Sequence, residues 1–211
     1  MLYDNDDIRI VGLTGMSGAG KTTACEVFAE KGFCIIDCDK VSRNVVEKGR
    51  PALGEIAAHF GEGILLGDGS LDRRKLGGIV FSDKQSLAAL DGIIYPFIHF
   101  EIIRVISERA KAGETLFLLD APTLFESGAD VFCDCVVSVT ADKDICRERI
   151  MQRDGLTREQ AEMRLSSQHG RAFYEERSYR CIVNGGTREE LVRHLDETAE
   201  EIMQGAYIEQ T

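Results

Sequence analysis

Residues 15–22 read GMSGAGKT, and this glycine-rich octapeptide constrains the possible folds of the chain more than any other segment. It fits the pattern G-x-x-x-x-G-K-[ST], which is typical of loops that bind nucleoside triphosphates. Glycines let successive backbone N–H groups turn inward around phosphate oxygens. In such a loop Lys21 reaches the β- and γ-phosphates, and the Thr22 hydroxyl binds Mg²⁺. The alternative is a glycine-rich turn that binds nothing.

The sequence around this loop has the order that phosphate binding needs. The short apolar run at 8–13 predicts a buried parallel strand. After the loop, the apolar residues Ala24, Val27 and Phe28 predict a helix that ends at Gly32. The loop would then lie at the N-terminus of a helix, where the helix dipole favours anions. The order strand, loop, helix therefore favours a phosphate site over an empty turn.

Apolar runs and amphipathic stretches alternate along the rest of the chain. Such alternation is typical of α/β folds, in which a parallel sheet carries helices on both faces. We predict five strands, at 8–13, 33–36, 116–119, 136–139 and 181–183. We predict further helices at 84–92, 96–112, 143–153, 158–168 and 187–204, with each proline near the end of an element.

Polar residues follow several of these strands. In open parallel sheets, ligands bind beyond the carboxyl ends of the strands. The residues that this rule selects are Asp37, Asp39, Asp120, Pro122, Glu126 and Asn184. The mostly helical segment between the second and third strands is longer than a simple crossover needs, so we expect it to form a substrate-binding subdomain.

The composition narrows the classes of partner. The net charge of −11 argues against nucleic acid and against a membrane surface. No stretch reads as long and apolar enough to cross a bilayer, and the acidic first seven residues are unlike a signal peptide. We therefore expect a cytoplasmic protein whose seven cysteines are free and mostly buried thiols.

Further short motifs along the chain distinguish between families of proteins that share such a loop. They are GLTG at 12–15, IDCD at 36–39 followed by Arg43, FG at 60–61, IL at 64–65, DG at 68–69, LDR at 71–73, Leu76, VF at 80–81, PTLFE at 122–126, RI at 149–150, RD at 153–154, Gln168 and N-x-G at 184–186. Through these motifs the chain resembles the dephospho-CoA kinase family from residue 8 to residue 186. It departs from the family pattern at Cys38, Tyr95, Thr123, Ser178 and Tyr179, which lie outside the loop, the two aspartates and the arginines.

The resemblance implies a fold. This is a single domain over residues 1–211 with the three-layer α/β/α architecture of P-loop NTPases around a five-stranded parallel sheet. The core would comprise 7–40, 113–145 and 180–205, with a helical, CoA-binding insertion at about 41–112 and a helical lid at about 146–175.

The resemblance also implies an activity. The protein would use ATP to phosphorylate the ribose 3′-hydroxyl of dephospho-CoA, giving coenzyme A and ADP, as a monomer or small homo-oligomer. The loop alone equally fits a kinase of another small acceptor, such as a nucleoside monophosphate, or a nucleotide-dependent switch. The motif-bearing stretch at 60–81 favours dephospho-CoA kinase, and Asp39 together with the arginine-bearing stretch at 146–171 argues against a switch.

Phosphoryl transfer needs an oriented acceptor and neutralised charge. The resemblance implies that Asp39 is the catalytic base and that Arg149 closes over the nucleotide, with Lys21 as the cation of the loop. Asp39 equally fits an N-cap of the following helix. Arg149, with Arg153 four residues later on the same helix face, equally fits a solvated surface.

The remaining site residues fall into three sets. The set expected to bind ATP is Gly15, Ser17, Gly18, Ala19, Gly20, Lys21, Thr22, Thr23, Arg149 and Asn184. The set expected to bind the acceptor is Asp37, Asp39, Arg43, Arg73, Pro122 and Leu124, although the two arginines equally fit surface ion pairs. We expect Thr22 and Asp120 to bind Mg²⁺, although Asp120 equally fits a structural carboxylate.

Overall fold

The computed structural model describes residues 8–207, which form two compact units. Unit 1 combines the chain up to Ile36 with the chain from Gly113 onward, and unit 2 spans Asp37–Ala112. The acidic N-terminal stretch that we compared with signal peptides lies outside the described residues. The insertion expected from the sequence falls within unit 2.

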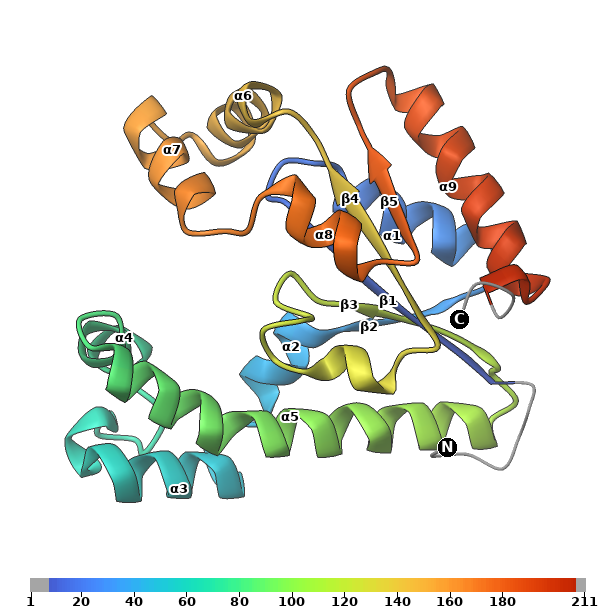
Figure 1. Ribbon diagram of the computed structural model, residues 1–211. Coiled ribbons are helices and arrows are strands. Elements are labelled where there is room, and N and C mark those ends of the chain that lie inside the picture. The colour runs from blue at the N-terminus through green and yellow to red at the C-terminus, as the bar shows by residue number, and fades with distance from the viewer. Residues whose placement is uncertain (1–7, 208–211) are drawn as a thin grey trace. The chain divides into compact units, whose positions relative to one another are not determined.

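A five-stranded sheet forms the centre of unit 1 (Figure 1). Its strands are β1 (Arg9–Gly15), β2 (Cys34–Asp37), β3 (Leu116–Asp120), β4 (Cys135–Thr140) and β5 (Arg180–Val183), in the order β2-β3-β1-β4-β5. β1 pairs in parallel with β3 and β4, and β4 pairs in parallel with β5. The predicted α/β fold with five strands is confirmed, and β1, which leads into the glycine-rich loop, lies in the middle of the sheet.

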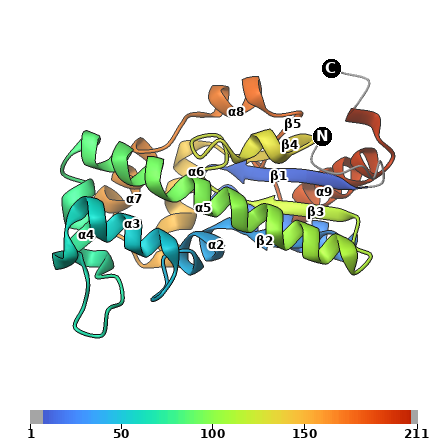
Figure 2. The same cartoon turned by 90° about the horizontal axis from the view of Figure 1, so that it is seen from below.

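Helices of unit 1 cover both faces of this sheet. They are α1 (Lys21–Glu30), α6 (Lys143–Asp154), α7 (Arg158–Ser166), α8 (Arg171–Arg177) and α9 (Arg188–Met203), with a 3₁₀ turn at Ala129–Phe132. α8 packs on β4 and β5 (Figure 2). α1 packs against α9 and against β1, β3 and β4. Both α7 and α9 begin with a capping box, formed by Thr157 with Gln160 and by Thr187 with Glu190, which explains why these helices start where they do.

Unit 2 is helical. It contains α2 (Cys38–Asn44), α3 (Pro51–Phe60), α4 (Arg73–Val80) and α5 (Lys84–Lys111), with a 3₁₀ turn at Glu62–Ile64 and an isolated bridge between Leu65 and Leu71. Helices α2, α3 and α4 each pack against α5, whose buried residues are Ile98, Ile102 and Ile106. This spacing of four residues places the three isoleucines on one face of α5, so a single stripe serves as the core of the unit.

The structure contradicts the prediction of two helices in this region and the prediction that Pro96 lies near the end of an element. The sequence predicted separate helices at 84–92 and 96–112, but the structure has one helix of 28 residues with Pro96 inside it. An internal proline costs a helix about 3 kcal/mol. Packing along the isoleucine stripe, together with the partly buried Leu87 and Leu90 before the proline, outweighs this cost.

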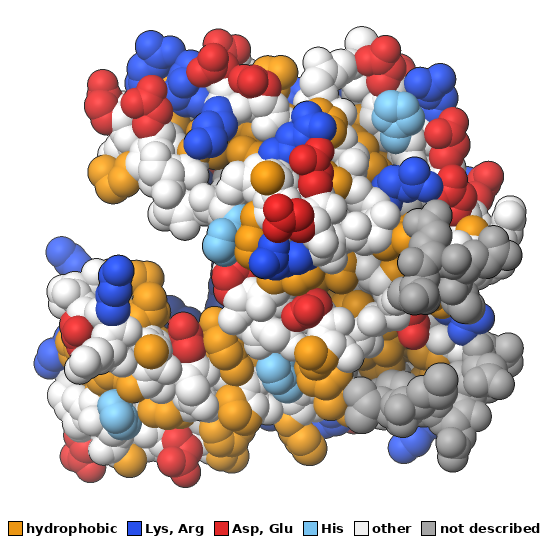
Figure 3. Space-filling view, in the orientation of Figure 1, with side chains coloured by type: hydrophobic (Ala, Val, Ile, Leu, Met, Phe, Trp, Pro, Cys, Tyr) orange, Lys and Arg blue, Asp and Glu red, His pale blue; other side chains and the backbone are white. Residues whose placement is uncertain are grey.

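Because α5 is continuous, the prediction that no segment is long and apolar enough to cross a membrane is also wrong. Among the described residues, α5 meets that criterion by length and composition alone. Apolar side chains gather along it in the space-filling view (Figure 3). One of the residues of α5, Phe100, is 68% exposed. Helices in the cores of water-soluble proteins meet the same criterion, so length and composition do not decide between the two environments.

The core of unit 1 yields a test of stability. Phe28 of α1 is fully buried and makes an edge-to-face contact with Phe33, with ring centroids 5.0 Å apart. We expect Phe28→Ala to lower the free energy of unfolding by about 3–5 kcal/mol, because it leaves a cavity in a packed core. Phe100→Ala, at an exposed position, should change it by less than about 0.5 kcal/mol. Urea denaturation measures both values, and an equal loss in the two variants would contradict the assigned core.

Candidate functional site

The loop between β1 and α1 depends on glycine at three positions. Gly15, Gly18 and Gly20 have φ angles of +142°, +77° and +116°, a region that residues with side chains rarely adopt. Gly20 is the N-cap residue of α1 and provides no side-chain cap. The amides at the start of α1 therefore remain available to a ligand.

Several amides of the loop point to no acceptor within the protein. Met16 N donates to Val139 O, and Ala19 N donates to Met16 O, both at 3.1 Å. Within residues 8–207, the structure records no acceptor for the N–H groups of Gly18, Gly20, Lys21 and Thr22. Four free amides at the N-terminus of a helix form a site for an anion such as a phosphate.

Two side chains distant in sequence hold carbonyl oxygens of the loop. Arg149 Nη1 of α6 donates to Gly18 O at 3.4 Å, and Asn184 Nδ2, directly after β5, donates to Ala19 O at 2.6 Å. Asn184 is buried, at 7% exposure. The sequence predicted that Arg149 closes over the nucleotide and that Asn184 is among the residues that bind ATP. The structure places both on the backbone of the loop, and their contacts with nucleotide stay predictions.

Lys21 and Asp120 form an ion pair on the sheet side of the loop. Asp120 is the last residue of β3 and aligns with Leu13 of β1. Both side chains are about four-fifths shielded from solvent, with exposures of 21% and 20%. The neighbouring Pro122 O accepts a hydrogen bond from Thr14 Oγ1 at 3.2 Å. The carboxyl end of β3 thus meets the loop, as the rule for parallel sheets predicted.

The oxygen donors near the loop fit a hard cation. Thr22 is exposed at the first turn of α1, and Asp120 offers a carboxylate. Magnesium binds through one or two such protein oxygens together with phosphate and water. No cluster of three or more His, Cys, Asp or Glu side chains suited to a metal occurs in the described part of the chain. The donor set therefore fits Mg²⁺ held jointly with a polyphosphate, and that role of Thr22 and Asp120 stays a prediction.

All seven cysteines lie in the described residues and none forms a disulfide, as predicted, but only three are buried, so the expectation that most are buried is wrong. Burial raises the pKa of the Cys135 thiol to about 12. A thiol in this state is a poor nucleophile and a poor metal ligand at neutral pH. Cys135 is thus a packing residue of β4.

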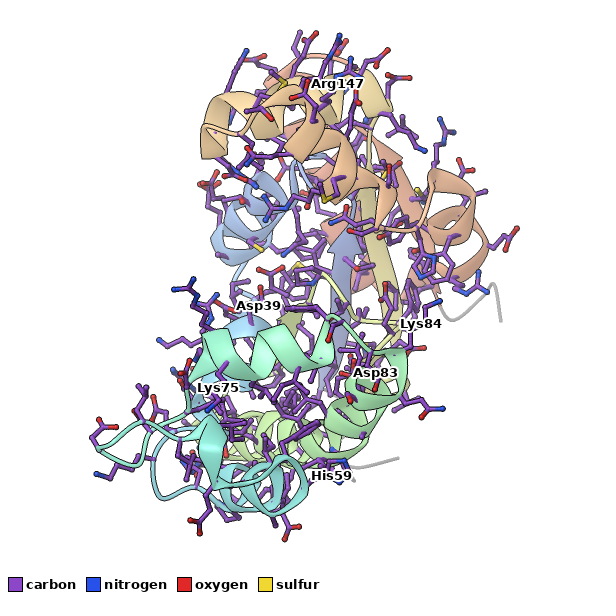
Figure 4. All side chains as sticks on the ribbon, turned by 90° about the vertical axis from the view of Figure 1, so that its left-hand side faces the viewer. Asp39, His59, Lys75, Asp83, Lys84 and Arg147 are labelled. Atoms are coloured by element: carbon purple, nitrogen blue, oxygen red, sulfur yellow. The ribbon has the colours of Figure 1, made fainter. Side chains whose placement is uncertain are left out.

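Ion pairs join α6 to α7. Asp154, at the end of α6, accepts from Arg153 Nε at 2.8 Å and from Arg164 Nη1 of α7 at 2.6 Å. The hydrogen bonds from Arg153, followed by those from Arg164, lower the pKa of Asp154 to about 2. Arg147, labelled in Figure 4, lies 2.6 Å from Asp144 and 3.6 Å from Glu162 of α7. Arg153 thus has the partner expected of a solvated face, whereas Arg149 reaches the loop.

A second contact fixes the chain between α7 and α8. His169 Nε2 lies 3.5 Å from a carboxylate oxygen of Glu126, and its ring stacks on Phe173 with centroids 3.7 Å apart. Burial, followed by the charge of Glu126, raises the pKa of the nearby Tyr174 phenol to about 12. Glu126, selected from its place after the third strand, therefore connects the turn after β3 to this segment.

Leu124, also in the turn after β3, was predicted to contact the acceptor. It is fully buried, and a methyl group added to Gly12 of β1 would collide with it. The structure therefore places Leu124 in the packing between this turn and the sheet. A contact of Leu124 with the acceptor stays a prediction.

In unit 2, Asp37 and Asp39 have different roles. Asp37 Oδ1 accepts from Lys40 N at 2.8 Å, so Asp37 caps α2. Asp39 lies in the first turn of α2 and is exposed (Figure 4). The structure records no hydrogen bond or ion pair of its carboxylate with residues 8–207. The alternative that Asp39 is the cap of this helix is therefore wrong, and its carboxylate is available to a ligand.

Arg43 and Arg73 lie together in unit 2. Arg73 Nη2, from the first turn of α4, donates to the backbone oxygen of Arg43 at 3.1 Å. Both residues are exposed, and neither guanidinium has an ion pair with a described residue. The alternative of surface ion pairs is therefore not realised in this structure, and the two cations are available to an anionic ligand.

Comparisons with known proteins identify the family. A sequence model described as dephospho-CoA kinase matches residues 9–190. The chain is 37% identical to a dephospho-CoA kinase of Enterococcus faecalis, covering 92% of this chain and 96% of that one. It is 38% identical to one of Geobacillus kaustophilus, covering 88% and 92%.

Solved structures agree with these sequence relatives. TT1252 from Thermus thermophilus superposes with a TM-score of 0.75 at 28% identity, covering 92% of this chain and 97% of that one. A dephospho-CoA kinase from Campylobacter jejuni superposes with a TM-score of 0.68 at 27% identity, covering 93% and 98%. The predicted P-loop kinase fold is thereby confirmed.

The loop glycines yield a matched test of nucleotide binding. A Cβ atom at Gly18 would lie 2.7 Å from the backbone oxygen of Cys146, whereas a Cβ at Gly32, with φ +92°, would meet nothing within 4 Å. We expect Gly18→Ala to weaken ATP binding at least about tenfold, because the loop must shift. Gly32→Ala should cost only stability, by about 1 kcal/mol. Calorimetric titration with ATP measures the affinities, and tight binding by Gly18→Ala would contradict the assigned loop.

Proposed function

The chain belongs to the dephospho-CoA kinase family, and from this membership we propose that it transfers the γ-phosphoryl group of ATP to the ribose 3′-hydroxyl of dephospho-CoA. The products are coenzyme A and ADP. The observation that carries the proposal is the set of free amides of Gly18, Gly20, Lys21 and Thr22 around the start of α1, in a chain whose family match spans residues 9–190. Phosphoryl transfer is mainly a matter of positioning and charge neutralisation, which these amides supply.

On the donor side, unit 1 binds ATP. The N–H groups of Gly18, Gly20, Lys21 and Thr22 donate to phosphate oxygens, assisted by the dipole of α1. The Lys21 ammonium exchanges its partner Asp120 for the β- and γ-phosphates. Arg149, already on the loop backbone, adds positive charge beside the transferred group.

On the acceptor side, unit 2 supplies the base. Asp39 accepts the proton of the attacking hydroxyl, a role supported by its exposed carboxylate without a protein partner. Asp37 is held by its cap bond to Lys40 and orients the start of α2. Arg43 and Arg73 bind the pyrophosphate of the acceptor, supported by their joint position and their lack of ion pairs.

Magnesium completes the proposed chemistry. When bound, it neutralises charge on the phosphate oxygens during transfer. Thr22 and Asp120 would hold it, because they are the oxygen donors at the loop. The expectations of a cytoplasmic monomer or small oligomer without nucleic-acid or membrane partners stay predictions.

The Asp39 proposal has a matched test. We expect Asp39→Asn to lower kcat at least about 100-fold, because the base is lost, while ATP affinity remains unchanged. Asp83→Asn is the control, since Asp83 is an exposed aspartate of unit 2 that caps α5, and asparagine caps equally well. Steady-state ADP release measures both variants. Full turnover by Asp39→Asn would remove Asp39 from the mechanism.

A panel of acceptors tests the substrate. We expect ADP release with ATP and dephospho-CoA to exceed that with any nucleoside monophosphate by at least about 100-fold, because each recognised polar group of the acceptor contributes to discrimination. The alternative, a kinase of another small acceptor, predicts the reverse order. Coupled-enzyme detection of ADP decides between them.

A further inference from the structure

Gln168 holds Ser17 of the phosphate loop by two hydrogen bonds. Ser17 N donates to Gln168 Oε1 at 3.0 Å, and Gln168 Nε2 donates to Ser17 Oγ at 2.8 Å. A backbone N–H requires an acceptor, so Oε1 must face Ser17 N, and the orientation of the carboxamide is determined by its partners. The sequence indicated this position only through the family resemblance and predicted no role for it.

These bonds fix one peptide group of the loop. The carbonyl of the Met16–Ser17 peptide accepts from Ala19 N at 3.1 Å, and its N–H donates to Gln168. A peptide group is planar, so holding both of its ends sets its rotation. The next peptide group joins Ser17 to Gly18, and its N–H is that of Gly18, the first of the free amides. The rotation of the Met16–Ser17 peptide therefore influences the direction in which the Gly18 N–H points.

The Ser17 amide differs from its neighbours because it already has a partner. The four amides of Gly18, Gly20, Lys21 and Thr22 have none within residues 8–207. A phosphate site formed by these four amides does not use Ser17 N, so a bound phosphate need not displace Gln168. Its two hydrogen bonds hold Ser17, which is next to the free amides but is not one of them.

Gln168 also connects the loop to α6 and α7. It follows α7 by two residues, and its own N–H donates to Leu165 O at 3.3 Å. α7 is joined to α6 through Asp154 and Arg147, and α6 carries Arg149, which holds Gly18 O. The α6–α7 segment thus holds two consecutive loop residues, Gly18 through Arg149 in the middle of α6 and Ser17 through Gln168 just after α7.

We propose that Gln168 is a positioning residue for nucleotide binding. Through Ser17 it keeps the free amides of the loop in the orientation that accepts the triphosphate, and it anchors the end of α7 to the loop. The inference rests on the proposed function in one respect only, that this loop binds ATP. The acceptor and the transfer step do not enter it.

The test compares two glutamines of the same segment. Gln168→Leu removes both bonds to Ser17 at similar side-chain size. Gln160→Leu is the control, because Gln160 supports only the capping box of α7, where its Oε1 accepts from Thr157 N at 2.9 Å. We expect Gln168→Leu to weaken ATP binding about tenfold by calorimetry, and Gln160→Leu to lower Tm while leaving the ATP affinity unchanged.

Two further readouts separate positioning from general loss of structure. KM for ATP should rise about tenfold in Gln168→Leu, while KM for the acceptor stays within about twofold. Ser17→Ala, which keeps the bond from Ser17 N but loses the hydroxyl, should weaken ATP binding about threefold. The double variant should bind ATP no more weakly than Gln168→Leu, because both bonds are already absent.

The outcomes distinguish the two proposals. Unchanged ATP affinity in Gln168→Leu, or an equal loss in Gln160→Leu, overturns the positioning role and leaves the kinase intact. Tighter binding also overturns it, since Gln168 would then compete with phosphate. If the unaltered protein does not bind ATP, the proposed function fails together with this inference. If Gln168→Leu does not fold, the double-mutant cycle of Ser17→Ala, Gln168→Asn and Ser17→Ala/Gln168→Asn replaces it. Losses of ATP affinity that add in the double variant overturn the inference, and a smaller loss than their sum supports it.

Discussion

The structure depends on a loop whose N–H groups must converge on one point. Backbone amides converge only if the intervening carbonyls turn away, which requires the positive φ angles of Gly15, Gly18 and Gly20. Those carbonyls in turn need donors, because unsatisfied backbone oxygens are costly where water is excluded. Arg149 supplies a donor to Gly18 O and Asn184 to Ala19 O. The site for the anion is therefore built as much by the side chains behind the loop as by the loop itself.

The sheet order explains how these side chains reach the loop. β1 lies between β3 and β4, and β5 lies beside β4. Because the strands of these pairs are parallel, the segments that follow them emerge at one edge, where the loop also begins. Asp120 ends β3, Asn184 follows β5, and Arg149 comes from the helix after β4. The topology thus brings residues separated by 99 to 165 positions to one loop.

Local signals account for what the sequence predicted well. The glycine pattern, the apolar strands and the acidic strand ends report on neighbouring residues, so the loop, the five strands and the position of Asp120 at a strand end near the loop followed from them. Long-range contacts account for what it missed. Pro96 suggested a break that packing along α5 overrides, and no local pattern marks Gln168 as a partner of Ser17. The distinction between Asp37 as cap and Asp39 as free carboxylate also required the backbone conformation, because both residues suit a helix start.

Charge poses a particular problem for this protein, since a chain of net charge −11 must attract a polyanion. The repulsive field of distant carboxylates is screened within about 8 Å at physiological ionic strength. Short-range donors act within that distance and do not depend on net charge. The free amides are such donors, and they add no formal charge that would need a partner when nucleotide is absent. Lys21, the one full charge of the loop, is paired with Asp120 in this structure, and under the proposed function phosphate oxygens replace this partner. If ATP binds as proposed, the acidic surface costs the site little, because the binding then relies on backbone dipoles and on Lys21, which is already paired with Asp120 in the absence of nucleotide.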